Sequence, residues 1–312
     1  MRNSAGSRAS RWNKALPRRW RRSARCAAAR AGRRWPEAGG RGRRASVTSE
    51  DRGHTAIVRV SILASSSSGN ATFVATSHTR LLVDAGLSVR ELTRRLALIG
   101  ERPEDLDAVL ITHEHSDHVS GLARLVKRHG KKAYLSRLTA PAIDWNGASP
   151  NVELFQAGSR FAIGDIEVNS FTVPHDAVDP VGFTLHAEGV RIGLATDLGY
   201  VTESVRVHLE TMDFVLLESN HDLEMLKVGP YPWSVKQRVM SRVGHLSNPG
   251  ACDFILRDLG PNVAHLVLGH LSEHNNHPEI VRLGAQQALA ERGARAALSV
   301  AGPKHPTEVF SF

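Results

Sequence analysis

Residues Thr112–Gly121 read THEHSDHVSG, and Thr112 is also the last residue of the apolar run LDAVLIT, residues 106–112. Positions 113–118 contain three histidines and two acidic residues. Imidazole and carboxylate groups are ligands that suit zinc, manganese or iron, so this density at the end of an apolar run indicates a metal site. A histidine-rich solvated turn is the alternative, and the spacing H-x-H-x-D-H disfavours it.

The spacing within the motif predicts a loop. We expect His113, His115, Asp117 and His118 to lie between a strand and a helix that begins near Val119. In a loop, side chains two residues apart can converge on one cation while the intervening ones converge on a second. Ligands on a regular helix would need the i, i+4 spacing instead.

Other strand ends supply candidates for the ligands that this loop cannot provide. His175 follows SFTVP, Asp197 ends RIGLATD and His270 ends AHLVLGH. Loops at strand ends commonly assemble sites on a rigid scaffold. Taken singly, each histidine would more often be a core or capping residue, but the HxHxDH motif favours a ligand role. Asp84, at the end of LLVD, is interpreted as a carboxylate that orients a liganding histidine, the alternative being an ordinary turn aspartate before Gly86.

The composition predicts a folded core and a basic tail. The chain has 312 residues, 41% of them hydrophobic, which is enough for a core in one or two domains. The formal charge is +9, yet residues 1–52 hold 16 of the 40 Lys and Arg residues and 3 of the 31 acidic ones, so the remainder is slightly acidic. No apolar stretch predicts a membrane span or signal peptide, and we expect a soluble, cytoplasmic protein with no membrane partner. Cys26 and Cys252 lie too far apart to suggest a disulfide framework.

Residues 1–52 are predicted to be a disordered, Arg-rich tail, because Arg, Ala and Gly bury too little apolar surface to offset chain entropy. Three explanations of the tail stay open: a nucleic-acid-binding arm, an organellar transit peptide, or a translation start assigned too far upstream. Residues 53–312 are predicted to form one catalytic domain.

Short apolar runs alternate with helical periods in that domain. Strands are expected at 57–63, 71–75, 80–84, 108–112, 166–173, 182–187, 191–196, 214–218, 264–268 and 296–299. Helices are expected at 89–99, 122–129, 137–145, 202–210, 234–243, 249–258 and 278–292. This order predicts an α/β fold in which two sheets lie face to face with helices outside.

In this order, Asp84, the HxHxDH motif, His175, Asp197 and His270 resemble the metallo-β-lactamase fold, an αββα sandwich of two mixed sheets with a two-metal site. The resemblance covers about residues 56–312. Four segments narrow it: SSSSGNATFV (65–74), ESNHDLEMLKVGPYPWSVKQRV (218–239), GHLSNPGA (244–251) and GHLSEHNN (269–276). They are similar to the YycJ (WalJ) family, described as DNA-degrading hydrolases with 5′ to 3′ exonuclease activity. One departure is ASSSSGN at 64–70, where the family usually has GSGSSGN.

The resemblance implies two divalent metal ions, zinc or manganese, since the ligands accept both. It implies that His113, His115 and His175 bind one ion, that Asp117, His118 and His270 bind the other, and that Asp197 bridges them. Two such ions at roughly 3.5–4 Å can share a hydroxide that attacks phosphorus in a phosphodiester. Asp117 is therefore counted among the catalytic residues as well.

Two further residues are candidates for protonating the leaving group. Glu218 ends DFVLLE and His245 opens HLSN, a pair that resembles the Glu/His arrangement of transfer-RNA 3′-processing enzymes of this superfamily. We hypothesise that Glu218 keeps His245 cationic near the departing oxygen. The alternative is that His245 only precedes a helix N-terminus at Ser247 and Asn248.

Several residues are candidates for substrate contact. The basic, aromatic stretch could follow a nucleic-acid backbone and stack bases, the serine run could hold a terminal phosphate, and one histidine could line the cleft. These residues are Tyr231, Trp233 and Lys236, with Lys227, Arg238 and Arg242 nearby; Ser67, Ser68 and Asn70; and His221. A solvated helix face and a Gly-assisted turn are the alternatives. His274, Asn275 and Asn276 are expected to order a loop.

The sequence thus predicts a dinuclear metal-dependent phosphodiesterase, a 5′ to 3′ DNA exonuclease, with RNA as a further possible substrate. Only 73 residues separate Asp197 from His270, too few for the large domain inserted there in β-CASP nucleases. One alternative is a hydrolase of thioesters, lactones or β-lactams at the same metals. Another is a nucleic-acid-binding protein that acts through its basic tail. The sequence does not indicate an oligomeric state.

Overall fold

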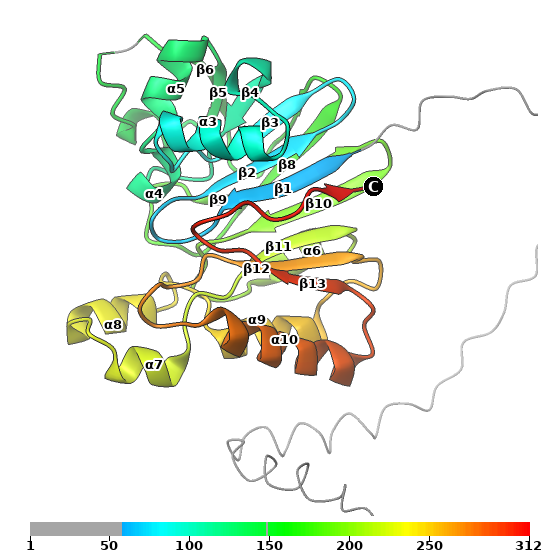
Figure 1. Cartoon of the computed structure of the whole chain (residues 1–312). Helices are drawn as coiled ribbons and strands as arrows, with labels where there is room; N and C mark the ends of the chain where they lie inside the picture. Colours follow the sequence, from blue (N-terminus) through cyan, green and yellow to red (C-terminus); the bar gives the residue numbers. More distant parts are fainter. Residues whose placement is uncertain (1–57, 148) are drawn as a thin grey trace, which may run out of the picture. The chain divides into compact units, whose positions relative to one another are not determined.

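The computed structural model describes residues 58–147 and 149–312, in which two β-sheets of seven strands each form the centre of the domain (Figure 1). The first sheet has the order β14 (Phe310–Ser311), β1 (Arg59–Ala64), β2 (Ala71–Ala75), β3 (Arg80–Val83), β4 (Ala108–Leu110), β5 (Lys132–Ser136) and β6 (Asn151–Phe155). The second has the order β13 (Ala297–Val300), β12 (His265–Gly269), β11 (Phe214–Glu218), β10 (Val190–Ala195), β9 (Val181–Ala187), β8 (Ile166–Thr172) and β7 (Arg160–Ile163). The predicted tail at 1–52 lies outside the described residues.

In each sheet, several strands run in the same direction, so their ends lie at the same edge. In the first sheet β3, β4, β5 and β6 are mutually parallel. In the second sheet β10, β11, β12 and β13 are parallel, and β8 runs in the same direction because it and β10 are both antiparallel to β9. Parallel strands end at one edge of their sheet, so the loops after them lie together.

Helices cover the outer faces of both sheets (Figure 1). Helices α3 (Val89–Leu98) and α5 (Leu122–His129) lie on the first sheet, where their buried apolar side chains join those of β2 and β3. Helices α6 (Glu203–Leu209), α9 (Asn248–Arg257) and α10 (Pro278–Arg292) lie on the second. Three further helices, α4 (Ser116–Val119), α7 (Leu223–Val228) and α8 (Trp233–Val239), appear on the left in Figure 1.

Local sequence explains the helices that were predicted. In α3, Val89, Leu92 and Leu96 are buried at helical spacing, and the Ser88 side chain accepts a hydrogen bond from Glu91 N at 3.3 Å. Helix α10 starts with proline in its first turn and ends at Gly293, whose φ of +73° suits glycine.

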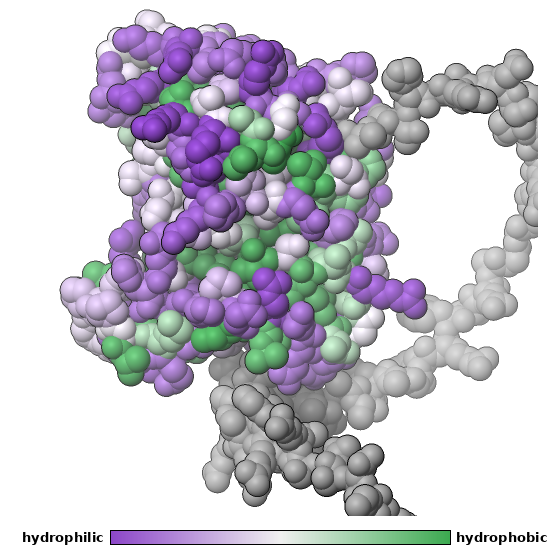
Figure 2. All heavy atoms as spheres, viewed as in Figure 1, coloured by the Kyte–Doolittle hydropathy of each residue, from purple (hydrophilic) through white to green (hydrophobic). Residues whose placement is uncertain are grey.

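A third apolar cluster fills the space between the sheets. It combines first-sheet residues such as Ile62, Val83 and Leu110 with second-sheet residues such as Phe183 and Phe214. Figure 2 shows hydrophobic residues gathered over the strands, below an upper helical layer with a mostly hydrophilic surface and above a lower helical layer where both kinds of residue are exposed. The layer order helix, sheet, sheet, helix confirms the predicted αββα sandwich.

The structure corrects several predicted elements. Residues 137–145 were expected to form a helix, but only a short 3₁₀ turn forms at Ala140–Ala142, because Pro141 lacks the N–H of a helix interior. Asp117 and His118 belong to the short helix α4 rather than to a loop, whereas α5 has the predicted bounds 122–129. Strands β5, β6, β7 and β14 and helix α7 were not predicted. None of the described helices is long and apolar enough to cross a membrane.

The inter-sheet cluster gives a stability prediction. Phe183 is fully buried there, with its ring edge-on to Phe155 at a centroid separation of 5.9 Å. We expect Phe183→Ala to lower the free energy of unfolding by about 3–5 kcal/mol, because it removes apolar contacts and leaves a cavity. Denaturant unfolding of the variant measures this. Val207→Ala, at a site 51% exposed, is the control and should change it by less than about 0.5 kcal/mol. A Phe183→Ala variant as stable as this control would contradict the assignment of the core.

Candidate metal centre

The histidines and carboxylates singled out in the sequence follow five different strands. Asp84 follows β3, the HxHxDH motif follows β4, His175 follows β8, Asp197 follows β10 and His270 follows β12. These segments come from both sheets, and their side chains meet at the edge where the strands end. The sandwich therefore brings together residues that lie up to 186 positions apart in the sequence.

Backbone geometry at three of these strand ends is unusual. Asp84, Asp197 and His270 have φ values of 62°, 58° and 54°, a left-handed conformation that costs a non-glycine residue of order 1–3 kcal/mol. Each turns the chain sharply where its strand ends. Beside them, a Cβ on Gly86 would lie 1.6 Å from the carbonyl oxygen of Asp117, so only glycine lets the motif approach so closely.

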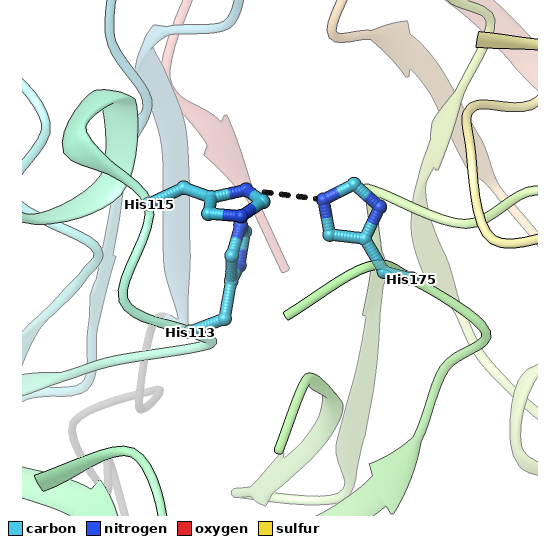
Figure 3. Close-up of side chains that lie close together, drawn as sticks. All are labelled: His113, His115 and His175. Atoms are coloured by element: carbon cyan, nitrogen blue, oxygen red, sulfur yellow. Dashed lines mark hydrogen bonds between the residues drawn. The ribbon is translucent and has the colours of Figure 1, made fainter. Parts of the chain in front are cut away.

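One cluster consists of His113, His115 and His175, whose ring nitrogens lie within 4.8 Å of one another. Figure 3 shows His113 and His115 on one side and His175 reaching toward them from the other. His115 Nδ1 is 3.2 Å from His175 Nε2. The three imidazoles thus face a common point.

A second cluster adjoins the first and contains Asp117, His118, Asp197 and His270. His118 Nε2 lies 3.3 Å from Asp197 Oδ2, and His270 Nε2 lies 3.4 Å from Asp117 Oδ2. The rings of His113 and His118 are 4.1 Å apart, which joins the clusters. Asp197 Oδ1 is also 3.9 Å from His175 Nε2, so this carboxylate lies beside both clusters.

In three of the histidines, the ring nitrogen that points away from the clusters lies within hydrogen-bond distance of an acceptor outside them. His118 Nδ1 lies 2.8 Å from Asp84 Oδ2, and His270 Nδ1 lies 2.8 Å from Glu218 Oε1. His175 Nδ1 lies 3.1 Å from the carbonyl oxygen of Gly244. An Nδ1 that donates its proton outward leaves Nε2 as a lone-pair donor toward the centre, the arrangement common for metal-binding histidines.

The residues fit divalent metal ions. His113 Nε2 and Asp197 Oδ2 are buried and have no hydrogen-bond partner among the described residues. Buried polar atoms are normally satisfied, so orphans that face a cluster of donors point to a missing partner. The donors are imidazole nitrogens and carboxylate oxygens, which suit zinc, manganese or iron. A metal ion would satisfy both orphaned atoms at once.

Burial and charge set the protonation of these groups. Burial and the neighbouring His118 hold the pKa of His113 well below its usual range, which keeps a lone pair free. Burial disfavours a charge on His270, but Asp197, Asp117 and Glu218 outweigh it and raise its pKa to about 10. In the same way Asp197 and Asp84 raise the pKa of His118. A metal ion must displace protons from these two histidines, so its binding depends on pH.

The buried Glu218 and the partly exposed His245 form a pair at the side of the second cluster. Glu218 Oε1 is 2.8 Å from His245 Nδ1 as well as from His270, and Glu218 Oε2 accepts from Leu198 N and Leu246 N. His245 outweighs the effect of burial and lowers the Glu218 pKa to about 2, while Glu218 raises the pKa of His245. The predicted contact between Glu218 and His245 is thus present, and its role as an acid stays a prediction.

The serine-rich loop is arranged differently from a phosphate cradle. Ser67 and Ser68 are exposed, and Ser68 Oγ donates to Glu273 Oε1 at 2.6 Å. Ser68 N and Gly69 N bond back to Ser66 within the loop. Its N–H groups are therefore largely used internally, beside a carboxylate that repels anions. Asn70, in contrast to Ser67 and Ser68, is buried, and its Nδ2 lies 3.0 Å from His118 Nε2, within the site itself.

The basic, aromatic stretch forms α7 and α8 near the site. Trp233 is 63% exposed at the start of α8 and is free to meet a ligand. Lys236 is buried, and its Nζ donates to the carbonyl oxygen of Lys227 at 2.7 Å, so it is not a surface cation. Tyr231 lies edge-on to His274 with ring centroids 5.8 Å apart. Substrate contact by these residues stays a prediction.

His221 is buried, and its Nδ1 has no hydrogen-bond partner among the described residues. Burial lowers its pKa to about 4, so the ring is neutral. Sequence reasoning missed two other participants: the contact of Glu218 with His270, and the carbonyl of Gly244 on His175. The sequence cannot indicate the Gly244 contact, because a backbone carbonyl is present at every residue. The contact between Glu218 and His270 could have been expected, because Glu218 lies at a strand end as Asp84 does.

Comparison with known proteins identifies the family. The Beta-lactamase superfamily domain matches residues 79–271. Exodeoxyribonuclease WalJ of Streptococcus pneumoniae serotype 2 is 41% identical over 75% of this chain and 88% of its own length. Exodeoxyribonuclease YycJ of Bacillus anthracis is 36% identical over 80% of this chain and 97% of its own length.

Solved structures share the fold. The metallo-beta-lactamase fold protein YhfI from Bacillus subtilis superimposes with a TM-score of 0.62 at 17% identity, covering 82% of this chain and 100% of that one. At that identity the likeness concerns the fold alone. Sequence similarity, fold and strand-end histidines agree, and the chain belongs to the beta-lactamase superfamily and, within it, to the WalJ/YycJ family.

Proposed function

We propose that this protein is a divalent-metal-dependent exonuclease that degrades DNA from the 5′ end. The observation that carries the proposal is the similarity to two exodeoxyribonucleases over most of their length. Two adjoining His/Asp clusters at the strand ends support it, because phosphodiester hydrolysis suits a pair of metal ions. The 5′ polarity follows the family resemblance stated from the sequence. We also propose a cytoplasmic location, which the sequence predicts and which agrees with a DNA substrate.

The proposed metal ligands are the residues of the two clusters. His113, His115 and His175 hold one ion, Asp117, His118 and His270 hold the other, and Asp197 lies between them. When bound, two zinc or manganese ions supply an activated water and offset the charge of the phosphodiester. Asp84 and Glu218 keep His118 and His270 oriented for this role.

His245 is the proposed proton donor to the departing oxygen. Its Nδ1 lies 2.8 Å from Glu218 Oε1, and Glu218 favours the protonated ring. Its side chain is 21% exposed, whereas that of Glu218 is fully buried, so His245 is the member of the pair that a substrate can reach. A cation there stabilises negative charge on a leaving oxygen.

Linear duplex DNA tests the proposal directly. The chain, with manganese or zinc, should release label early as short products from 5′-labelled DNA, whereas 3′-labelled DNA should shorten progressively. Covalently closed circular DNA should stay intact, because an exonuclease needs an end. Asp117→Ala should lose the activity, since Asp117 is a proposed ligand.

The alternatives predict different results in the same assay. A small-ester hydrolase would cleave a chromogenic ester and leave all DNA intact. A binding protein that acts through its basic tail would retard DNA without shortening it, with strong salt dependence. Either result with a fully metallated protein would contradict the nuclease proposal.

Replacement of His245 tests the proposed acid. We expect His245→Ala to reduce the rate of DNA hydrolysis by about 10²- to 10⁴-fold, because proton donation to the leaving oxygen is lost. Metal content, measured by elemental analysis, should match the unchanged chain. His78→Ala, at an exposed histidine in the turn between β2 and β3, is the control. A variant that loses a metal ion would make His245 a ligand, and unchanged turnover would exclude both roles.

A further inference from the structure

An ion pair between Asp176 and Arg238 lies next to the first cluster, and neither residue has a role in the proposed function. Asp176 directly follows the proposed ligand His175, and Arg238 belongs to α8. Arg238 Nε donates to Asp176 Oδ2. The pair therefore links α8 to the loop that carries a proposed metal ligand.

The other carboxylate oxygen of Asp176 has a different environment. Asp176 Oδ1 is buried and has no hydrogen-bond partner among the described residues, although the side chain as a whole is 26% exposed. It lies 3.5 Å from His175 Nε2, the same nitrogen that faces His115. A buried carboxylate oxygen without a donor is costly, so this one points to a cation that it would face.

The loop around Asp176 is fixed at several points. Val178 N donates to Glu114 Oε1 at 2.8 Å, which ties the loop to the HxHxDH motif. Gly199 N donates to the carbonyl oxygen of Pro174 at 2.9 Å. With Arg238 holding Oδ2, the direction of Asp176 Oδ1 is set by three different segments of the chain.

The first cluster has no anionic ligand of its own, which indicates a role for the Asp176 carboxylate. The three imidazoles of that cluster are neutral when they act as ligands, and its nearest proposed anion, Asp197, is shared with the second cluster. The second cluster has Asp117 to itself. A divalent ion held by neutral donors in a buried site is stabilised by a nearby anion.

We propose that Asp176 supplies an additional carboxylate to the metal position at His113, His115 and His175, and that Arg238 fixes this carboxylate in place. The inference rests on the metal centre of the proposed function. It places the two residues at the rim of the cluster, with Asp176 facing the ion and Arg238 acting through Asp176 as a positioning residue.

Cobalt(II) binding tests this inference without an activity assay. Titration of the full chain with Co²⁺, followed by visible absorption, reports the affinity and ligand environment of each site. We expect Asp176→Asn to weaken one of two sites by about 10- to 100-fold and to shift its absorption bands. Arg238→Ala should weaken the same site by a smaller factor, because Asp176 remains but loses its support. The other site should be unchanged in both variants.

A second aspartate–arginine pair provides the control. Asp105 pairs with Arg102 in an exposed turn, and Asp105→Asn should leave both Co²⁺ affinities and the spectrum unchanged. Thermal unfolding of each variant confirms that it is folded. Asp176→Asn with the spectrum and both affinities of the unchanged chain would overturn the inference, as would an equal effect of Asp105→Asn.

The design separates this inference from the proposed function. An unchanged chain that binds no Co²⁺ would overturn both, because no metal position would exist for Asp176 to face. A chain that binds two Co²⁺ ions and still leaves DNA intact would overturn the nuclease proposal alone. The comparison with Asp176→Asn would then still decide the role of Asp176.

Discussion

The candidate site depends on hydrogen bonds that point away from it. Asp84, Glu218 and the carbonyl of Gly244 each accept from the outer nitrogen of a histidine, at 2.8, 2.8 and 3.1 Å. These contacts fix the tautomer and the direction of the rings, so that three Nε2 atoms face inward without protons of their own once a metal is bound. Loss of an outer acceptor would free the ring to rotate or to carry its proton on the wrong nitrogen. The inner residues define which ions bind, but the outer acceptors determine whether the inner atoms converge at all.

The sandwich supplies those acceptors through the direction of its strands. Asp84 and Glu218 stand at the ends of strands in opposite sheets, and each reaches a histidine from a neighbouring strand end. Left-handed backbone at Asp84, Asp197 and His270 turns the chain immediately after the strand, at a cost that the buried layers on both sides offset. Three of the five non-glycine residues with positive φ among the described residues lie at this edge, and such strain is characteristic of a functional site. The apolar cluster between the sheets is therefore a precondition of the chemistry, since it keeps the two halves of the site in register.

Much of this architecture could be predicted from the sequence, and the failures have physical causes. Strands such as β2 and β11 are short, fully buried apolar runs and were predicted with their observed bounds. Strands β6 and β7 were missed because they are half-exposed at sheet edges and carry polar residues. The HxHxDH motif was recognisable because its ligands are close in sequence. Asp176 was not, since its relation to the site depends on Arg238, which lies 62 residues away and on another element. Lys236 and Asn70 show the converse, because both were candidates for substrate contact and both side chains are buried.

The link between α8 and the His175 loop extends the site beyond the two clusters, because Gly244 and Arg238 both come from the segment that contains the exposed Trp233. A substrate that contacts this segment therefore also contacts the support of a proposed ligand. Anomalous diffraction from crystals of the zinc-loaded chain tests the central claim most directly. We expect two peaks, one among His113, His115 and His175 and one among Asp117, His118 and His270, with Asp197 between them. A single peak, or peaks held by other residues, would contradict it.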